Sequence, residues 1–357
     1  MNLARSLNLI AAARKTFELD LSGLTVFTEA ASGYFALTPL IAALAGAHEV
    51  IAIGRDSRYG KFAGIEDFIS NLSEKAGCLE KIRFVNQKKS DDVSMVDIVT
   101  NLGFVRPIDN DMVSWMKPTA VVSLMWEPWE FRPEDVDLRA CEKRQVAILG
   151  TNENASTLRT FEFVGLLGVK LLLEADIEVF KSDIVVLGSG HFGFNTMKKL
   201  TGLGANVLWI DTHGEVPQAP EHVNRFKDLD DEGLEFLSRA DALVIVEHES
   251  REELIGVGAP LDFDTLKGMN EGITVIHICG GIDIFGLKNS GLRYAPTAIR
   301  PSGFMSLTTA YLGPRPLIDL HTAGLRVGEL LARARIAGKS VLEAKEIALR
   351  RAPAKDF

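Results

Sequence analysis

Three glycines and a downstream acid form the motif in this sequence that is best suited to binding a ligand. Gly188, Gly190 and Gly193 follow a short apolar run, and Asp211 ends the next apolar run. In such a motif the first glycine allows a tight turn, the second lets the backbone approach a pyrophosphate, and the third lets a helix pack closely on a strand. The pyrophosphate would lie at the helix N-terminus, where backbone N–H groups favour an anion. The spacing therefore predicts a dinucleotide-binding site.

Asp211 indicates which dinucleotide would bind. It follows Gly188 at about the 20-residue spacing of a carboxylate that binds the ribose hydroxyls. The next residues, Thr212, His213 and Gly214, include no arginine or lysine, so a 2′-phosphate would meet the charge of Asp211 unopposed. The sequence thus favours NAD over NADP. The residues expected to contact the cofactor are Gly188, Gly190, His191, Phe192, Gly193, Asp211, Thr212, Cys279, Gly280 and Gly281.

Hydride transfer at a carbinol carbon needs a group that exchanges the hydroxyl proton, and histidine has a suitable pKa. His321 is the first choice, with Asp319 two residues away as an orienting carboxylate. An equally good interpretation is that His321 begins a helix and hydrogen-bonds a backbone group. His277 ends a strand-like run next to Gly280 and is the next candidate, although packing within the strand would also explain it. His248 is a third candidate.

Candidate substrate-binding residues follow the strands of the first half, because open α/β sheets place ligands at the carboxyl ends of their strands. Arginines there could clamp a carboxylate or phosphate, and a serine–glycine turn could present backbone amides to it. Three more residues lie at the expected junction between domains, a common position for a cleft. The candidates are Ser32, Gly33, Tyr34, Arg55, Arg58, Glu127, Asn152, Glu153 and Arg159. Together they predict a small anionic substrate.

The elements that position these residues are predicted from alternating apolar runs. Strand-like runs occur at 24–28, 49–53, 81–85, 97–100, 120–124, 146–149, 184–187, 207–210, 242–246 and 275–278. Apolar residues at helical spacing occur between and after them, at 37–44, 65–76, 155–178 and 322–337. The strand-like runs are nearly continuous in apolar residues, which is typical of parallel strands covered on both faces.

The chain of 357 residues is long enough for two domains. We expect an α/β protein of two doubly wound parallel-sheet domains, a flavodoxin-like substrate domain over 1–153 and a Rossmann dinucleotide-binding domain over 181–299. An interdomain helix over 154–180, with Asn154 as its N-cap, would join them. Residues 300–357 would return to the first domain. The basic end from Arg350 to Lys355 is interpreted as a solvated terminus.

Composition argues against several functional classes. The net charge of −9 disfavours a nucleic-acid partner. No apolar run reaches the roughly 18 residues of a membrane span, and the N-terminal segment lacks the apolar core of a signal peptide. Cys78, Cys141 and Cys279 are widely spaced, so neither a metal site nor a disulfide framework is indicated. A cytoplasmic protein without a metal, membrane or nucleic-acid partner is expected.

This organisation resembles the D-2-hydroxyacid dehydrogenase superfamily, which includes formate dehydrogenase. The segment from Asn101 to Leu124, with its Lys117-Pro118 pair, is similar to that family's helix followed by Lys-Pro and a strand. The run from Gly150 to Asn154 is similar to the family's turn before the interdomain helix. The resemblance implies NAD as the cofactor, a catalytic histidine in the region of His321, and pairing into a homodimer.

One position departs from the family pattern. Family members carry an arginine just after the strand on the nicotinamide side, whereas here Val275–Cys279 is followed by Gly280 and Gly281. Without that guanidinium, a 2-oxo acid carboxylate loses its bidentate partner. Arg300, which precedes a Pro-Ser-Gly turn, is the candidate replacement.

The expected function is an NAD-dependent oxidoreductase that transfers a hydride between the nicotinamide and a small polar hydroxy, oxo or amino substrate with an anionic group. Two alternatives stay open. S-adenosylhomocysteine hydrolase has a related layout, so the chain could hold NAD tightly and use transient oxidation for elimination or hydrolysis. The missing arginine also allows a non-catalytic sensor that binds NAD(H).

Overall fold

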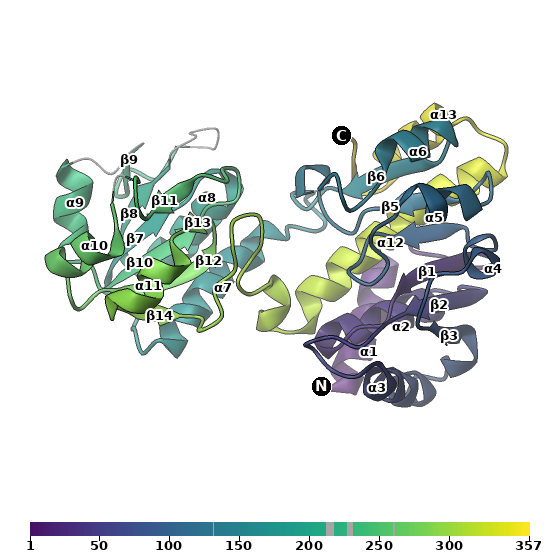
Figure 1. Cartoon of the computed structure of the whole chain (residues 1–357), viewed down its shortest axis with the longest axis horizontal. Coiled ribbons are helices and arrows are strands. Elements are labelled where there is room, and N and C mark those ends of the chain that lie inside the picture. The colour runs from purple at the N-terminus through teal and green to yellow at the C-terminus, as the bar shows by residue number, and fades with distance from the viewer. Residues whose placement is uncertain (131, 212–217, 227–230, 260) are drawn as a thin grey trace. The chain divides into compact units, whose positions relative to one another are not determined.

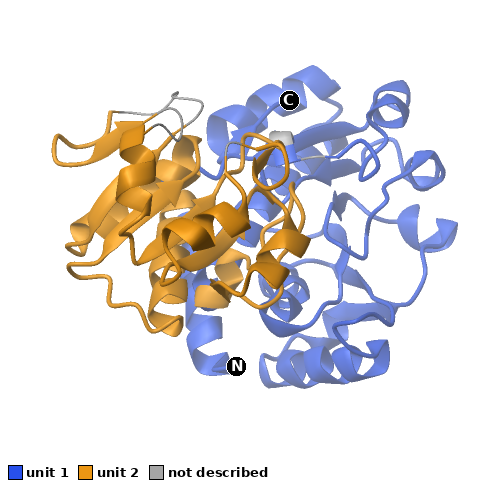
Figure 2. Cartoon of the chain, turned by 60° about the vertical axis from the view of Figure 1, so that its left-hand side comes forward, with its two compact units in different colours: residues 1–159, 313–357 blue, residues 160–312 orange. Residues whose placement is uncertain are grey.

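The chain divides into two compact units. The computed structural model describes residues 1–130, 132–211, 218–226, 231–259 and 261–357. Unit 1 comprises Met1–Arg159 and Gly313–Phe357, and unit 2 comprises Thr160–Leu312 (Figure 2). The sequence placed the beginning of the C-terminal return at residue 300, whereas residues 300–312 group with unit 2.

Unit 1 is built on a sheet whose described strands lie in the order β15-β6-β5-β4-β1-β2-β3 (Figure 1). Strands β1 to β6 pair in parallel, and β15 pairs antiparallel with β6. The strands are β1 (Thr25–Glu29), β2 (Glu49–Ile53), β3 (Ile82–Val85), β4 (Ile98–Thr100), β5 (Val121–Ser123), β6 (Ala147–Thr151) and β15 (Ala354–Lys355). The predicted doubly wound sheet is confirmed. Its parallel strands have the order 3-2-1-4-5-6, so β3 extends the sheet one strand beyond the flavodoxin-like order 2-1-3-4-5.

Helices cover both faces of this sheet because alternate strand residues point to opposite sides. Val26 and Val50 join one apolar core with α1, α2, α3, α12 and α13, and Phe27 and Ile51 join a second core with α4, α5 and α6. The helices are α1 (Leu3–Thr16), α2 (Leu37–Leu44), α3 (Phe62–Lys75), α4 (Ser90–Val93), α5 (Asn110–Trp115), α6 (Leu138–Lys143), α12 (Pro314–Ile336) and α13 (Val341–Arg351), with short 3₁₀ turns η1 (Gly33–Ala36), η2 (Leu79–Lys81) and η3 (Pro128–Glu130).

Unit 2 contains a parallel sheet whose described strands lie in the order β14-β12-β10-β7-β8-β9. This is the dinucleotide-fold order 3-2-1-4-5-6, with β7 as the first strand. The strands are β7 (Asp183–Leu187), β8 (Asn206–Ile210), β9 (Asn224–Phe226), β10 (Ala242–Val246), β12 (Thr274–Cys279) and β14 (Arg293–Ala295), and a separate pair joins β11 (Glu253–Ile255) to β13 (Gly281–Ile282). The predicted Rossmann topology is confirmed.

The unit 2 sheet is also covered on both faces. Val186 and Val244 pack with α7 and α8, while Val185 and Leu243 pack with α9, α10 and α11. The helices are α7 (Phe161–Glu174), α8 (Gly190–Gly202), α9 (Asp231–Leu237), α10 (Phe263–Met269) and α11 (Ile284–Ser290), followed by the 3₁₀ turn η4 (Thr309–Leu312). The topological switch point lies between β7 and β10, and open α/β sheets bind ligands at such a point.

The helix expected from residue 155 begins later. α7 starts at Phe161 with Thr160 as its N-cap residue, and Asn154 instead lies in a turn where its N–H donates to Asn152 Oδ1 (3.1 Å). Arg159 has a φ of 51°, a left-handed conformation that a right-handed helix cannot include. The apolar spacing therefore located the helix but not its start.

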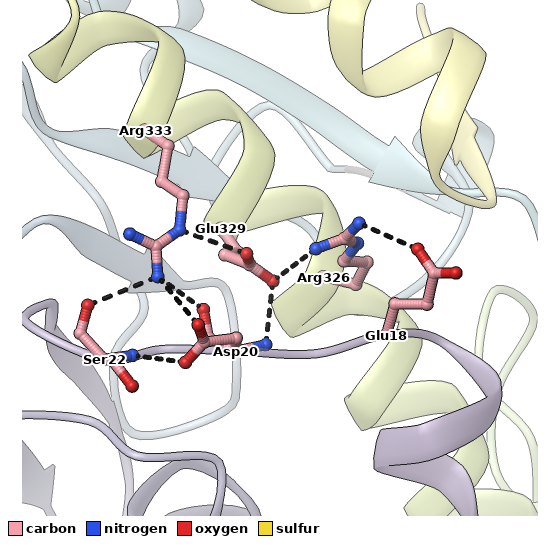
Figure 3. Close-up of polar contacts among 6 residues, drawn as sticks. All are labelled: Glu18, Asp20, Ser22, Arg326, Glu329 and Arg333. Atoms are coloured by element: carbon pink, nitrogen blue, oxygen red, sulfur yellow. Dashed lines mark hydrogen bonds and ion pairs between the residues drawn. The ribbon is translucent and has the colours of Figure 1, made fainter.

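An ionic network centred on the buried Arg326 and Glu329 joins α12 to the segment that precedes β1 (Figure 3). It comprises Glu18, Asp20, Ser22, Arg326, Glu329 and Arg333. The buried Glu329 carboxylate accepts hydrogen bonds from Arg326 Nη1 (2.8 Å), Arg333 Nε (3.1 Å) and the Asp20 N–H (3.1 Å). Arg326 also lies 3.5 Å from Glu18 Oε2. The Glu329 carboxylate thus joins α12, near the C-terminal end of unit 1, to the segment just before β1.

Candidate functional site

In unit 2, β7 leads through the glycine turn into α8. A Cβ on Gly188 would lie 2.4 Å from the Val246 carbonyl oxygen, and a Cβ on Gly193 would lie 2.0 Å from the Gly188 carbonyl oxygen. Trp209 Nε1 donates a hydrogen bond of 2.8 Å to that same Gly188 oxygen. Backbone approaches both positions too closely for any side chain. Gly188 therefore lets the turn lie against β10, and Gly193 lets the first turn of α8 lie against Gly188.

Gly190 faces an acidic side chain. Its φ is 60°, and Glu249 Oε1 lies 1.9 Å from where a Cβ on Gly190 would be. The Glu249 carboxylate therefore fills the space that this glycine leaves at the start of α8. The neighbouring Glu247 is buried and accepts hydrogen bonds from three backbone N–H groups, those of Ser189 (2.9 Å), Glu249 (2.7 Å) and Ser250 (3.0 Å). Two carboxylates of the chain itself, those of Glu247 and Glu249, therefore lie at this helix start, where backbone N–H groups favour anions.

Aromatic rings surround the first turn of α8. His191 stacks on Phe161 with ring centroids 5.5 Å apart, and Phe192 stacks on His248 at 4.0 Å with an interplanar angle of 11°. The structure therefore packs His191 and Phe192, which were predicted from the motif, and His248, which was considered as an acid–base group, at the glycine turn. Their rings connect α7, α8 and the segment after β10.

Asp211 follows β8, and its side chain is fully buried. It forms an ion pair with Arg225 of β9, whose guanidinium lies over the Trp209 ring at 4.8 Å from the centroid. Thr212 lies outside the described residues. The sequence argument considered cations directly after Asp211, and so it missed Arg225, which reaches Asp211 through strand pairing.

His277 lies inside β12 with no exposed surface. Because the Gly280 carbonyl can only accept, His277 Nε2–H donates to it (3.1 Å), and Nδ1 of the neutral ring accepts from the Ser306 hydroxyl (2.8 Å). The Ser306 Oγ in turn accepts from the Arg300 N–H (3.0 Å). Burial lowers the pKa of His277 to about 4. This geometry suits a neutral residue that connects β12 to the 300–306 turn, which was the packing interpretation of the sequence.

The glycines that follow β12 have a steric cause. Gly281 pairs with Glu253 in the short β11–β13 sheet, and a Cβ on Gly281 would lie 2.2 Å from the Glu252 carbonyl oxygen. Gly280 has a φ of 128°, which favours glycine. Cys279 is buried at the end of the strand. An arginine side chain after this strand would therefore collide with the segment that precedes β11.

In unit 1, His321 lies in the middle of α12 rather than at a helix start. Its side chain is buried, Nδ1 hydrogen-bonds Thr38 Oγ1 (2.8 Å), and burial lowers its pKa to about 3. Asp319 cannot orient it, because residues two apart on a helix point in different directions. Asp319 instead lies 3.9 Å from Arg315, and burial raises its pKa to about 6. The expected His–Asp pair is therefore wrong.

Carboxyl groups gather at the carboxyl ends of β5 and β6. The buried Glu127 side chain accepts from the Glu153 N–H (3.1 Å) and from Lys355 Nζ (2.7 Å). Burial raises the pKa of the Glu130 carboxyl group to about 7 and that of the Glu153 carboxyl group well above its usual range, and the nearby Glu127 carboxylate raises both further. The C-terminus was interpreted as solvated, but β15 brings Lys355 into this cluster.

The other predicted substrate residues are not brought together by the structure. Arg55 lies over the Phe104 ring (5.7 Å), whereas Arg58 lies over Tyr59 and donates to its hydroxyl (2.6 Å). They therefore do not form one clamp. Ser32, Gly33 and Tyr34 lead into or lie in η1, Asn152 forms the turn after β6, and Arg159 ends the first segment of unit 1.

Sequence reasoning missed a buried titratable group at the same edge of the sheet. Glu29 ends β1, accepts from the Phe104 N–H (3.4 Å), and has its pKa raised to about 7 by burial. Arg106 lies over Trp126 (5.3 Å from the ring centroid) and forms a 3.0 Å ion pair with Asp135. A glutamate at the end of an apolar strand was the available signal.

Three further findings concern metal ligands, membrane spans and thiols. Among the described residues, no three His, Cys, Asp or Glu side chains are grouped as metal ligands. No helix in the described part of the chain is both long and apolar enough to cross a membrane. The thiols of Cys78, Cys141 and Cys279 are reduced and buried.

No protein-family model matches this chain. No curated protein matches its sequence either. Similar solved structures include the A chain of dipicolinate synthase from Bacillus halodurans (13% identity, 88% of this chain and 99% of that chain, TM-score 0.54) and from Bacillus subtilis (13%, 90% and 98%, 0.51). The pyruvate reductase of Chlamydomonas reinhardtii is also similar (14%, 89% and 98%, 0.51). At these identities the likeness concerns the fold: the chain shares the α/β fold of the dipicolinate synthase A chains and of the pyruvate reductase, as the sequence led us to expect.

Proposed function

We propose that unit 2 binds a nicotinamide dinucleotide at the glycine turn, with its pyrophosphate at the start of α8. The observation that carries this proposal is the carboxylate of Glu249 over Gly190. A carboxylate and a phosphate oxygen seek the same backbone N–H donors, so Glu249 stands where a phosphate would. The turn lies at the switch point of a sheet with the dinucleotide-fold strand order.

The residues present fit such a ligand. Gly188 and Gly193 keep the turn tight, and Gly190 leaves room for the pyrophosphate once Glu249 moves aside. Asp211 follows β8, the next strand, where a ribose would be bound, and Arg225 lies beside it in β9. A bound nicotinamide ring would supply a hydride acceptor or donor. The chain itself supplies the sites that hold and orient the ligand.

We further propose an oxidoreductase that acts on a small polar hydroxy, oxo or amino substrate with an anionic group. Support comes from unit 1, where burial and the neighbouring Glu127 carboxylate raise the pKa values of Glu130 and Glu153, so that this cluster can hold a proton near neutral pH. Arg55, at the carboxyl end of β2, is exposed and can attract an anion. NAD and a homodimer remain the sequence-based predictions for the cofactor and the assembly.

The first experiment is a calorimetric titration of the purified protein with NADH and NADPH. We expect at least one to bind with a micromolar Kd. Gly190→Ala should weaken that binding at least about tenfold, because its Cβ would occupy the phosphate position at a φ that disfavours alanine. Gly202→Ala is the matched control, because Gly202 lies in the same helix and a Cβ there would have no neighbouring atom within 4 Å.

Failure of both dinucleotides to bind the wild-type protein would refute the proposal. Equal binding by the wild-type protein and Gly190→Ala would place the dinucleotide elsewhere. Binding that matches the expectation would justify assays with small 2-oxo acids, in which NADH or NADPH consumption is followed by absorbance.

A second candidate function is a dinucleotide-binding sensor without catalysis. It is favoured by the burial of His277 and His321, whose depressed pKa values keep both side chains neutral and hydrogen-bonded inside their own units. In that case the dinucleotide would bind as expected, but no oxo, hydroxy or amino acid substrate would cause its turnover.

A further inference from the structure

The ion pair between Asp211 and Arg225 bears on which dinucleotide unit 2 would take. The Asp211 side chain has no exposed surface, whereas that of Arg225 is 23% exposed. The Asp211 N–H donates to the Phe226 carbonyl (2.8 Å), and Trp209 pairs with Arg225 across β8 and β9. Strand register therefore fixes the arginine beside the acid.

This arrangement changes the electrostatic argument for NAD. An unpaired aspartate at the end of the second strand binds ribose hydroxyls and repels a 2′-phosphate. Here the Arg225 guanidinium balances the charge of Asp211 and is the partly exposed member of the pair. A guanidinium has five N–H donors, and its flat face can rest on an aromatic ring while its edge binds phosphate oxygens. The Trp209 ring supplies that support.

We propose that Arg225 makes this site selective for a dinucleotide that carries a 2′-phosphate, NADP(H) rather than NAD(H). The inference rests on the proposed dinucleotide site and specifies its ligand. Arg225 is a specificity-determining residue that binds the 2′-phosphate, while Asp211 holds the guanidinium in place. The absence of a cation among the residues directly after Asp211 does not matter, because the cation comes from the neighbouring strand.

Unit 2 offers a matched control for this arginine. Arg239 forms a 2.7 Å ion pair with Asp183 and lies over the Phe236 ring at 4.5 Å from the centroid. Its contacts are of the same kind as those of Arg225, but Asp183 begins β7 whereas Asp211 follows the end of β8. Arg239 therefore belongs to the amino edge of the sheet, opposite the glycine turn.

The test compares ligands that differ in the 2′-phosphate alone. NADPH is compared with NADH, and 2′,5′-ADP with 5′-AMP, by calorimetry on the full-length protein. We expect each phosphorylated ligand to bind at least about tenfold more tightly than its partner, the range of one charge-assisted hydrogen bond. Arg225→Gln should bring both ratios to about one, Arg225→Lys should keep part of the preference, and Arg239→Gln should keep all of it.

The outcomes separate this inference from the proposed function. If the wild-type protein binds NADH as tightly as NADPH, or if Arg225→Gln keeps the preference, Arg225 does not set specificity. The proposed dinucleotide site is not refuted by either result. If neither dinucleotide binds the wild-type protein, both proposals fail. Retained NADH binding by Arg225→Gln shows that this variant is folded, so its loss of preference then supports the inference.

Discussion

Glu329 in unit 1 and Glu247 in unit 2 are both buried carboxylates with three hydrogen-bond donors each, yet the donors differ. Two guanidinium groups and one N–H hold Glu329, so opposite charges of the chain balance it (Figure 3). Three backbone N–H groups at and near the glycine turn donate to Glu247. Backbone donors of this kind also bind phosphate. The first arrangement joins two segments of unit 1 through side-chain charges, whereas the second fixes the backbone around the glycine turn, beside the Glu249 carboxylate that we propose is exchanged.

The largest effect is expected from removing the charge that balances two arginines. Glu329→Gln would leave the buried Arg326 guanidinium without its close partner, and such a loss costs about 3–5 kcal/mol. Urea unfolding should show that decrease in the free energy of unfolding. Glu18→Gln is the matched control, because Glu18 contacts the same guanidinium but is 78% exposed; its cost should stay below about 1 kcal/mol.

A decrease of less than about 1 kcal/mol for Glu329→Gln would contradict the view that this carboxylate holds α12 in place. Dinucleotide affinity should be the same in both variants at temperatures where they are folded. A change in affinity would mean that the network also acts on the binding site.

Glu29 extends the comparison to a buried carboxyl group with a weaker set of donors. Burial raises its pKa from 4.5 to about 7, so the folded protein keeps a proton that the unfolded chain loses above pH 4.5. Its contribution to stability is complete below pH 4.5 and is lost as the pH rises through 7. Between pH 5 and pH 8 the free energy of unfolding of the wild-type protein should therefore fall by about 2–3 kcal/mol more than that of Glu29→Gln, which has no carboxyl group to ionise at this position.

Unfolding free energies measured between pH 4.5 and 8 test this sign. The exposed Glu80 of the same unit provides the control, and Glu80→Gln should leave the slope unchanged. A Glu29→Gln slope identical to that of the wild-type protein would mean that Glu29 is ionised in the folded state.

The sequence predicted the strands well because buried parallel strands are continuous apolar runs. β2 and β10 have the predicted bounds, 49–53 and 242–246. Their order was less predictable, since the place of β3 at the edge depends on pairing with β2. The start of α7 was missed because Arg159 adopts a left-handed conformation that its residue type does not signal.

The candidate site was less predictable for the same reason. Glycine spacing specified the turn, because backbone lies too close to Gly188 and Gly193 for a side chain and Gly190 has a left-handed φ of 60°. The charges around it come from other strands: Arg225 reaches Asp211 through the β8–β9 register, and Lys355 reaches Glu127 across 228 positions of sequence. His321 was chosen by residue type, whereas its burial depends on how α12 packs on α2.

The smallest effect concerns Glu249, the anion that we propose is exchanged. Glu249→Gln removes the charge that lies over Gly190 and would repel a pyrophosphate. We expect the Kd of the preferred dinucleotide to fall about tenfold, since the wild-type protein must first move a carboxylate away from the start of α8. Glu252→Gln, an exposed glutamate on the same segment, should change the Kd less than twofold. Weaker binding by Glu249→Gln would show instead that Glu249 helps to hold the ligand, and the analogy between its carboxylate and a phosphate would have to be abandoned.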